Sequence, residues 1–338
     1  MTKQIEKNML RERATPLPNV TDEMWNQVNK FNREKVEEFL EESTHLSKQS
    51  YKQYKSALRI FYHWVHETFG EEKLIYELKK KDFMRFQNFL IRKGLSSNAV
   101  KMKRSAVSSL NKYLINFYED EKDFATFRNF VEGVPNPTPS KVYNKIPLTK
   151  EEFEMVINTL EENEDWQILA ALHFLYASAC RRSELVQIHK SVIDNSPLKD
   201  KDGNDTNMYM TNEVRAKGKG EFGEIRKLYF DNRAKEAMIK WLEIRGQDDC
   251  PFLFATKYNG EVKQISVSAI NYWCKEIISD IVGRRVNPHL IRGTRSTHIL
   301  EEGKDIKKAQ SLLGHKQSST TDQFYDLRQN KDDLSDIF

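Results

Sequence analysis

The sequence predicts a mainly α-helical protein with two domains and one small antiparallel β-sheet. Three observations support this fold class. Apolar residues recur every three or four positions along most of the chain, which is the period of an amphipathic helix. Residues 134–148 contain four prolines and interrupt that period, which indicates an extended linker. Only residues 208–215 and 224–230 look like strands, and the glycine-rich stretch between them indicates a hairpin.

The composition is that of an ordinary globular protein. A chain of 338 residues is long enough for two cores, and 38% hydrophobic with 31% charged residues is typical of folded domains. The longest apolar run, Ile168 to Ala177, contains His173 and is too short to span a bilayer. The N-terminus has no apolar signal region, and the three cysteines form no Cys-x-x-Cys pair. We therefore expect a cytoplasmic protein with reduced thiols and no metal.

Positive charge is concentrated in the first part of the chain. Residues 1–148 contain 26 Lys and Arg against 19 Asp and Glu, a net charge of +7. The whole chain contains 54 against 50, so the remainder holds 28 against 31, a net charge of −3. This asymmetry favours a first half that binds a polyanion, although a solvated surface explains a modest excess nearly as well.

Four helices are predicted in the first domain, after a basic and flexible arm at residues 1–20. The first helix starts after Asp22, and a break in its pattern near Asn32 could divide it in two. Caps and glycines give the other limits: a second helix from Ser47 or Ser50 to Gly70, a third that ends at Gly94, and a fourth that starts at Ser96 or Ser97. Four such helices are expected to pack as a small bundle.

The outer face of the fourth helix is a candidate DNA-binding surface. Cations and hydroxyls on such a face suit phosphate oxygens and base edges in a groove. The candidates are Lys101, Lys103, Arg104, Ser105, Ser108 and Lys112. A surface that only keeps the domain soluble would have the same composition, and both interpretations remain open.

The second domain is predicted to begin with a capping box from Thr149 to Glu152, which starts a helix that runs to about Glu162. The remaining elements follow from caps and turns: helices from Asp165, Asn232, Ser266 or Ser268, Pro288, Asp305 and the 318–321 stretch, and a buried segment at 252–254.

The stretch from Ser178 to Leu185 places an arginine at a turn between two helices. Arg181 can offer a planar, two-pronged guanidinium to the non-bridging oxygens of a phosphate. Glu184, three residues later, can fix that arginine if its carboxylate is buried. A plain ion pair between Arg181 and Glu184 is the alternative interpretation.

Residues 287–327 bring two histidines, an arginine and a tyrosine together in sequence. His289 and Arg292 are three residues apart, which puts both side chains on one helix face. His315 follows the expected end of the next helix, and Tyr325 comes ten residues later. A tyrosine hydroxyl there could attack a phosphorus atom that the basic groups hold. Each of these residues taken singly is more often structural, but their combined order is specific.

Three patterns in this stretch resemble the second signature block of the tyrosine recombinase (phage integrase) family: His-x-x-Arg, then Leu-Gly-His, then Thr-Thr-x-x-x-Tyr. Residues 178–185 are similar to the family's first block, usually Thr-Gly-Leu-Arg-x-Ser-Glu-Leu. The Gly-Lys-Gly around Lys219 resembles the tip of the family's hairpin. The chain departs from these patterns in three places: Ala179 replaces the usual glycine, Arg182 replaces an apolar residue, and the gap from the hairpin tip to Arg226 is longer than usual.

The resemblance implies a catalytic set, with Lys217 as the alternative to the lysine: Arg181, Lys219, His289, Arg292, His315 and Tyr325. It also implies transesterification, in which Tyr325 attacks a DNA phosphate, forms a 3′-phosphotyrosine link and releases a 5′-hydroxyl. The arginines would stabilise the transition state, the histidines would assist by hydrogen bonding and proton transfer, and the lysine would protonate the leaving oxygen. No cofactor is expected.

By this resemblance, the helical bundle is a core-binding (SAM-like) domain that precedes a tyrosine-recombinase catalytic domain. The expected layout is a flexible arm (1–20), the core-binding domain (21–133), a linker (134–148), the catalytic domain (149–327) and a C-terminal tail (328–338). The expected partner is double-stranded DNA with specific sites, on which copies of the protein assemble as a dimer or tetramer. The tail carries apolar residues that could pack on a neighbouring copy: Leu334, Ile337 and Phe338.

These expectations describe a site-specific recombinase or integrase of a phage or mobile element. The competing interpretation is a DNA-binding protein on the same fold that no longer cuts and acts as a repressor. Ala179, Arg182 and the lengthened hairpin favour this competitor. The presence of all six reactive side chains favours the enzyme, because a protein that only binds DNA has no need of Tyr325.

Overall fold

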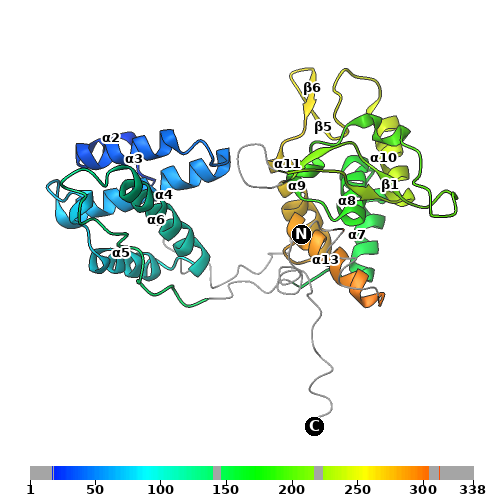
Figure 1. Ribbon diagram of the computed structural model, residues 1–338. Coiled ribbons are helices and arrows are strands. Elements are labelled where there is room, and N and C mark those ends of the chain that lie inside the picture. Colours follow the sequence, from blue (N-terminus) through cyan, green and yellow to red (C-terminus); the bar gives the residue numbers. More distant parts are fainter. Residues whose placement is uncertain (1–16, 18, 140–145, 217–223, 304–311, 313–338) are drawn as a thin grey trace, which may run out of the picture. The chain divides into compact units, whose positions relative to one another are not determined.

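The computed structural model describes residues 17, 19–139, 146–216, 224–303 and 312 (Figure 1). These residues fall into two compact units, and each is considered by itself. The N-terminal unit holds the described residues up to 139, and the C-terminal unit holds those from 146 onward. The helices predicted after Gly303, the tail and most of the arm lie outside the described residues.

The N-terminal unit is a helical bundle. Its elements are α2 (Asp22–Gln27), α3 (Lys30–Glu42), α4 (Lys48–Phe69), the short 3₁₀ helix η1 (Ile75–Glu77), α5 (Lys80–Arg92) and α6 (Ser97–Phe117). Asn29 caps α3, so the first predicted helix is indeed two helices. Of the alternative caps, Ser47 precedes α4 and Ser96 precedes α6, and each hydroxyl accepts a hydrogen bond from the amide three residues later.

Aromatic rings form much of the core of this bundle. Phe61 on α4 lies 5.9 Å from Phe83 and 4.9 Å from Phe86 on α5, measured between ring centroids. Phe130, from the turn-rich segment after α6, lies 6.0 Å from Phe61. Ring pairs at these separations add to the stabilisation that burial provides. The segment after α6 therefore closes the core, which the helical period did not predict.

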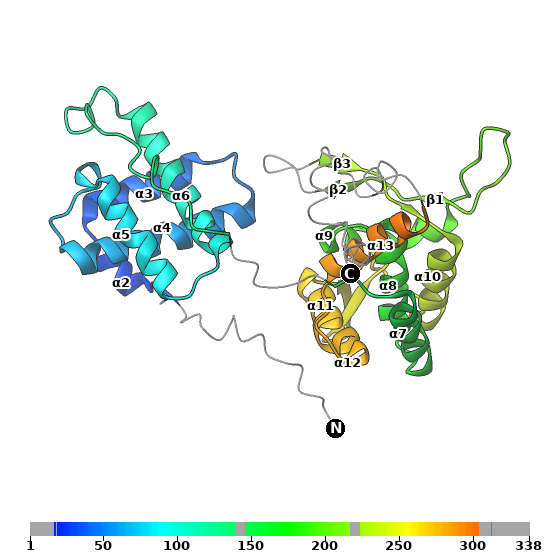
Figure 2. The ribbon, with the colours of Figure 1, turned by 90° about the horizontal axis from the view of Figure 1, so that it is seen from below.

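The C-terminal unit is built around α8 (Trp166–Ser178), which is buried along most of its length. Figure 2 shows three helices against it: α7 (Lys150–Glu162), α10 (Asn232–Arg245) and α13 (Pro288–Glu301). The predicted capping box forms, because Thr149 and Glu152 exchange hydrogen bonds between side chain and backbone. Asp165 precedes α8 as expected, but its side chain makes no capping hydrogen bond.

The predicted hairpin is one antiparallel ribbon in two short pieces. β2 (Val214–Ala216) pairs with β3 (Glu224–Arg226), and β1 (Tyr209–Met210) pairs with β4 (Tyr229–Phe230). The residues between β2 and β3, 217–223, lie outside the described residues. The fold class is therefore as predicted, mainly helical with small antiparallel sheets.

A second hairpin was not predicted. β5 (Ala255–Tyr258) pairs with β6 (Glu261–Gln264), and the hairpin projects from the C-terminal unit in Figure 1. Asn259 and Gly260 at its turn have φ values of 50° and 80°. Positive φ at both central residues is the turn that an Asn-Gly pair favours, so the signal was present in the sequence.

The helix predicted before Gly283 contains a π-helical turn. Its three consecutive pieces are α11 (Val267–Tyr272), the π-helix η3 (Trp273–Ile278) and α12 (Ser279–Val282). Ser266, rather than Ser268, caps the start. A π-turn inside a helix is frequent at functional sites, and no sequence signal predicted it here. In the described part of the chain, no helix is both long and apolar enough to cross a membrane.

The stability of the C-terminal unit should depend on pH through His173, which lies on α8 and is 6% exposed. Burial, helped by the charge of Arg233, lowers the pKa of His173 from 6.5 to about 4. The unfolded chain therefore takes up this proton at higher pH than the folded chain does. Stability should fall as the pH drops through 6.5 towards 4, by about 3 kcal/mol in total.

Urea unfolding at pH 7 and at pH 4 measures this contribution. His173→Gln should lose about 3 kcal/mol less than the wild type between the two pH values. His45→Gln is the matched control, because His45 is an exposed histidine of the N-terminal unit and does not contribute to the core of the C-terminal unit. A His173→Gln protein with the wild-type pH dependence would contradict the assignment.

Candidate active site

A sharp turn between α8 and the short helix α9 (Arg182–Leu185) positions Arg181. Ala179 ends α8 in the left-handed conformation, with φ 45° and ψ 33°. Residues with a Cβ rarely adopt this conformation, which explains why glycine is usual at this position. The turn forms with alanine all the same, so Ala179 does not displace Arg181 from the start of α9.

The carboxylate of Glu184 fixes Arg181 in place. Glu184 is 0% exposed. Its Oε2 accepts a hydrogen bond from the Arg181 amide at 2.7 Å, and its Oε1 accepts one from Arg181 Nη1 at 3.1 Å. The predicted support of Arg181 by a buried glutamate is therefore present. The Arg181 side chain itself is 23% exposed.

A second arginine binds the same carboxylate. Arg226, at the end of β3, donates from Nη2 to Glu184 Oε2 at 2.7 Å. Burial alone would raise the pKa of Glu184, but the hydrogen bonds and charges of Arg226 and Arg181 outweigh it and hold the pKa below its usual value. Glu184 is therefore a buried anion between two cations. Arg226 was not predicted as a partner of Glu184, because the two residues lie 42 positions apart in the chain.

Helix α13 supplies His289 and Arg292. Asn287 caps the helix and Pro288 is its first residue, so the start agrees with the prediction. Arg292 is 1% exposed, and its Nη1 donates to the carbonyl oxygen of Ala179. This hydrogen bond ties α13 to the turn that carries Arg181. His289, one helical turn earlier, is exposed.

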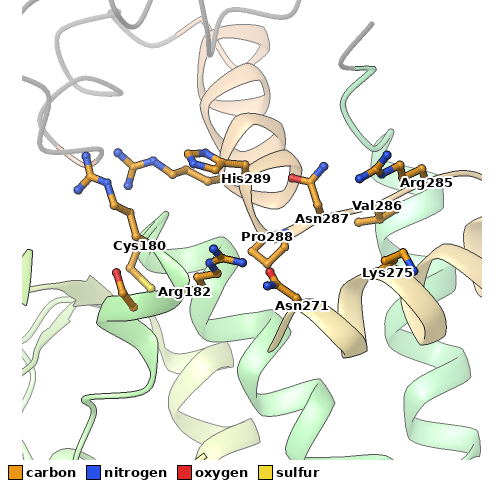
Figure 3. Close-up of a pocket in the computed structure, with 12 residues that line it drawn as sticks. Cys180, Arg182, Asn271, Lys275, Arg285, Val286, Asn287, Pro288 and His289 are labelled. Atoms are coloured by element: carbon orange, nitrogen blue, oxygen red, sulfur yellow. The ribbon is translucent and has the colours of Figure 1, made fainter. Parts of the chain in front are cut away.

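Arg181, His289 and Arg292 line one open pocket of about 450 Å³. Figure 3 shows His289 on α13 and Arg182 at the start of α9 on its walls. Cationic and hydrogen-bonding side chains from two separate helices converge there. Such an arrangement suits an anion with several oxygens, such as a phosphate.

Two further cations line the same pocket and were not predicted. Lys275 comes from the π-helical turn and Arg285 from the loop before α13 (Figure 3). The consecutive pair Arg284 and Arg285 could have been noticed in the sequence. Only the structure separates their roles, because Arg284 instead donates to the carbonyl oxygen of Ile146 at 2.8 Å.

The structure thus brings together three of the six predicted catalytic residues. The others, with the alternative lysine, lie outside the described residues: Lys217, Lys219, His315 and Tyr325. Within the described ranges, no group of three or more His, Cys, Asp or Glu residues could hold a metal ion.

The six residues proposed for DNA contact on α6 do not share one face. Lys101, Ser105 and Lys112 are exposed, and Ser108 is half-buried. Ser108 also accepts a hydrogen bond from the Asn129 side chain at 2.8 Å, so part of its capacity is used within the unit. An outer face of α6 therefore remains, but it is smaller than predicted.

Placing Lys103 on that outer face was wrong, and Arg104 is half-buried. Lys103 is 8% exposed, and burial lowers its pKa. Arg104 donates from Nη2 to the carbonyl oxygen of Val134 at 2.8 Å, and its guanidinium lies 5.5 Å from the Phe83 ring centroid. The helical period explains Lys103, because a residue two positions after Lys101 points to the opposite side of the helix. Arg104, three positions after Lys101, shares its face, but its long side chain folds back onto the Val134 carbonyl oxygen and the Phe83 ring.

Helix α4 carries a basic stripe that was not predicted. Lys48, Lys52 and Lys55 are exposed and follow at spacings of four and three, which keeps them on one helix face. Arg59 continues the stripe, and its Nη1 lies 2.7 Å from a carboxylate oxygen of Asp22. The spacing of these lysines was visible in the sequence, but only the apolar residues between them were used there, to predict which face of the helix is buried.

Comparison with known proteins identifies the class. Residues 147–331 match the Phage integrase family, and residues 32–117 match the Phage integrase, N-terminal SAM-like domain. The first match spans more than half of the chain. The protein therefore belongs to the tyrosine recombinase (phage integrase) family, with a SAM-like N-terminal domain and a phage integrase catalytic domain.

Particular relatives refine this placement. The chain is 39% identical over 341 residues to the SPbeta prophage-derived recombinase-like protein YomM of Bacillus subtilis (strain 168), with all of both chains covered. It is 30% identical over 229 residues to the tyrosine recombinase XerC of Vibrio atlanticus (strain LGP32), with 65% of this chain and 66% of the relative covered.

Two solved structures share the fold. The Tn1549 transposon integrase in complex with transposon right end DNA has a TM-score of 0.65 at 15% identity, with 90% of this chain and 96% of that chain covered. The XerH recombinase bound to palindromic difH substrate also has a TM-score of 0.65 at 15% identity, with 100% and 90% covered.

Proposed function

We propose that this protein is a site-specific DNA recombinase of a phage or mobile element that cuts and rejoins DNA through a 3′-phosphotyrosine intermediate. The observation that carries the proposal is the pocket where Arg181, His289 and Arg292 meet. Arg181 rests on the buried Glu184, and Arg292 is held by a hydrogen bond to the turn before Arg181. Donors fixed in this way need little reorganisation when charge develops on a phosphate, which favours catalysis.

The proposed reaction is a transesterification at phosphorus. The hydroxyl oxygen of Tyr325 bonds to phosphorus, the bond from phosphorus to the 5′ oxygen breaks, and a 3′-phosphotyrosine link remains. His289 and His315 assist by hydrogen bonding and by taking up the tyrosine proton, and Lys219 gives a proton to the 5′ oxygen. Arg181 and Arg292 stabilise the extra negative charge on the non-bridging oxygens.

Rejoining reverses these steps with another strand. The 5′-hydroxyl of the incoming strand attacks the phosphotyrosine, restores a phosphodiester and releases Tyr325. No external energy source is required, because the tyrosine link conserves the broken diester. Several copies of the protein assemble on the DNA sites in this scheme, because strand exchange takes place between two duplexes.

The test is covalent trapping. A duplex selected by the protein from a random-sequence pool is nicked at successive positions near its centre, so that the fragment released by cleavage diffuses away. The wild-type protein should then form a complex that survives SDS, and peptide mapping should find the DNA on Tyr325. Tight binding without any SDS-resistant species would show that the protein acts as a DNA-binding repressor that does not cut.

The basic faces of the N-terminal unit should contribute to DNA affinity. Lys52→Glu on α4 and Lys101→Glu on α6 should each weaken DNA binding about tenfold. The fall of the logarithm of the binding constant with the logarithm of salt concentration should become less steep by about one, because each lysine neutralises about one phosphate. Fluorescence anisotropy on a labelled duplex between 50 and 200 mM salt, the range over which such contacts weaken strongly, measures both quantities.

Lys240→Glu is the matched control for these substitutions. Lys240 is exposed on α10 of the C-terminal unit and is not among the residues that line the pocket. It should leave affinity and salt dependence nearly unchanged. Equal effects of all three substitutions would remove α4 and α6 from the DNA interface.

A further inference from the structure

The base of the β2–β3 hairpin is tied to the chain segment that follows Arg181. The side-chain amide of Gln187, two residues after α9, bonds to both backbone groups of Arg215 on β2. Its Nε2 donates to the Arg215 carbonyl oxygen at 3.0 Å, and its Oε1 accepts from the Arg215 amide at 2.9 Å. Gln187 therefore takes the place of a neighbouring strand at this edge of the hairpin.

A second tie holds the other strand. Arg226, on β3, donates to Glu184 at 2.7 Å, and the same carboxylate accepts the hydrogen bonds of Arg181. Glu184 lies in α9 and Gln187 in the turn that directly follows it, so one short segment of chain holds both strands. The position of the hairpin and the position of Arg181 are thus set by the same segment.

Packing alone does little to hold β3. None of its three residues is buried, and Ile225 is 64% exposed. Only β2 contributes buried side chains, Val214 and Ala216. The other buried apolar side chains of the ribbon, Tyr209, Leu228 and Phe230, lie on the side of β1 and β4, so the polar ties through Gln187 and Arg226 add restraint where β3 itself has no buried residue.

We propose that Gln187 and Arg226 are positioning residues that set the β2–β3 hairpin relative to Arg181. This inference rests on the proposed function, in which a lysine between β2 and β3 protonates the leaving oxygen. The strands pair up to Ala216 and Glu224, so the two ties act on the strands that precede and follow residues 217–223 in the chain. Loss of either tie should impair proton transfer to the leaving oxygen more than phosphate binding.

A sulfur substrate separates these two effects. When sulfur replaces the bridging 5′ oxygen at the cleaved phosphate, the bond from phosphorus to sulfur breaks and leaves a thiolate. A thiolate needs no proton, because a thiol is a far stronger acid than an alcohol. Gln187→Ala and Arg226→Met should cut the oxygen substrate about 10- to 100-fold more slowly than the wild type, yet cut the sulfur substrate within about threefold of it.

Matched controls come from the other hairpin and from the surface. Gln167 accepts a hydrogen bond from the Ala255 amide of β5 at 2.9 Å, so Gln167→Ala removes a similar hydrogen bond from the β5–β6 hairpin. Arg233 makes an exposed ion pair with Glu154. Gln167→Ala and Arg233→Met should cut both substrates at the wild-type rate. Equal slowing of both substrates in Gln187→Ala and Arg226→Met would overturn the proposal.

Hydrogen exchange tests the inference without any cutting. In Gln187→Ala and Arg226→Met, the β2 and β3 amides should exchange at least tenfold faster than in the wild type, while amides of α8 and α10 stay unchanged. Unchanged exchange in the hairpin would refute the positioning role. If the wild type cuts neither substrate, the proposed function fails, and the exchange result still decides whether these residues hold the hairpin.

Discussion

Replacement of Tyr325 by phenylalanine is expected to abolish the SDS-resistant complex with DNA and to leave affinity for the uncut site within about twofold. The substitution removes only the oxygen that would bond to phosphorus. A large electrostatic interface loses little when one hydroxyl is removed, so binding should persist. The neighbouring Phe324 has no hydroxyl and cannot act in its place. Denaturing gels with end-labelled nicked duplex measure the complex, and gel shifts measure binding.

Tyr258→Phe is the matched control for this substitution. Tyr258 is 69% exposed on the β5–β6 hairpin and lies outside the pocket. This variant should form as much covalent complex as the wild type. A covalent complex that persists in Tyr325→Phe would mean that another residue attacks the phosphorus. A joint loss of complex and binding would mean that Tyr325 has a structural role.

The second large effect is expected at Arg181. Arg181→Ala should slow formation of the covalent complex about a thousandfold, because it removes a fixed, charged donor at the point where negative charge develops. Affinity for uncut DNA should fall about tenfold at most, since many other cations contribute to binding. Arg181→Lys should also be slow, because an ammonium keeps the charge but cannot present the planar fork. Single-turnover cleavage of the nicked duplex measures these rates.

Arg233→Ala serves as the comparison, since Arg233 is an exposed arginine that pairs with Glu154 on the surface. Its cleavage rate should equal that of the wild type. Circular dichroism checks that Arg181→Ala is folded, because among the described residues Glu184 would keep only Arg226 as a cationic partner. A folded Arg181→Ala protein that cuts at the wild-type rate would exclude Arg181 from the reaction.

Local signals in the sequence predicted most helix limits correctly. Ser47, Ser96 and Asn287 lie at helix starts because their side chains accept hydrogen bonds from nearby amides, an interaction that depends on only a few residues. The short motif around Arg181 was equally local, since Glu184 is three residues away. Interactions between residues three or four positions apart can be predicted from the spacing of residue types in the sequence alone.

Exposure was harder to predict than helix position. Lys103 and Arg104 lie on a correctly predicted helix, yet their environment depends on partners such as Val134, which lies 30 residues from Arg104. The pattern of apolar residues shows which side of a helix is buried. It does not show that a charged side chain at the border folds inward to satisfy a distant carbonyl oxygen.

The sequence by itself determined the family signatures, the helical character of both domains and the identity of the residues proposed for the reaction. The tertiary structure alone decided which of them meet. Arg292 joins Arg181 because its guanidinium binds the Ala179 carbonyl oxygen, 113 residues away. Arg226 joins them because it pairs with the buried Glu184 carboxylate that also binds Arg181, and both cations offset the cost of burying that charge. These contacts form only when the chain is folded, so the spacing of residues in the sequence does not predict them.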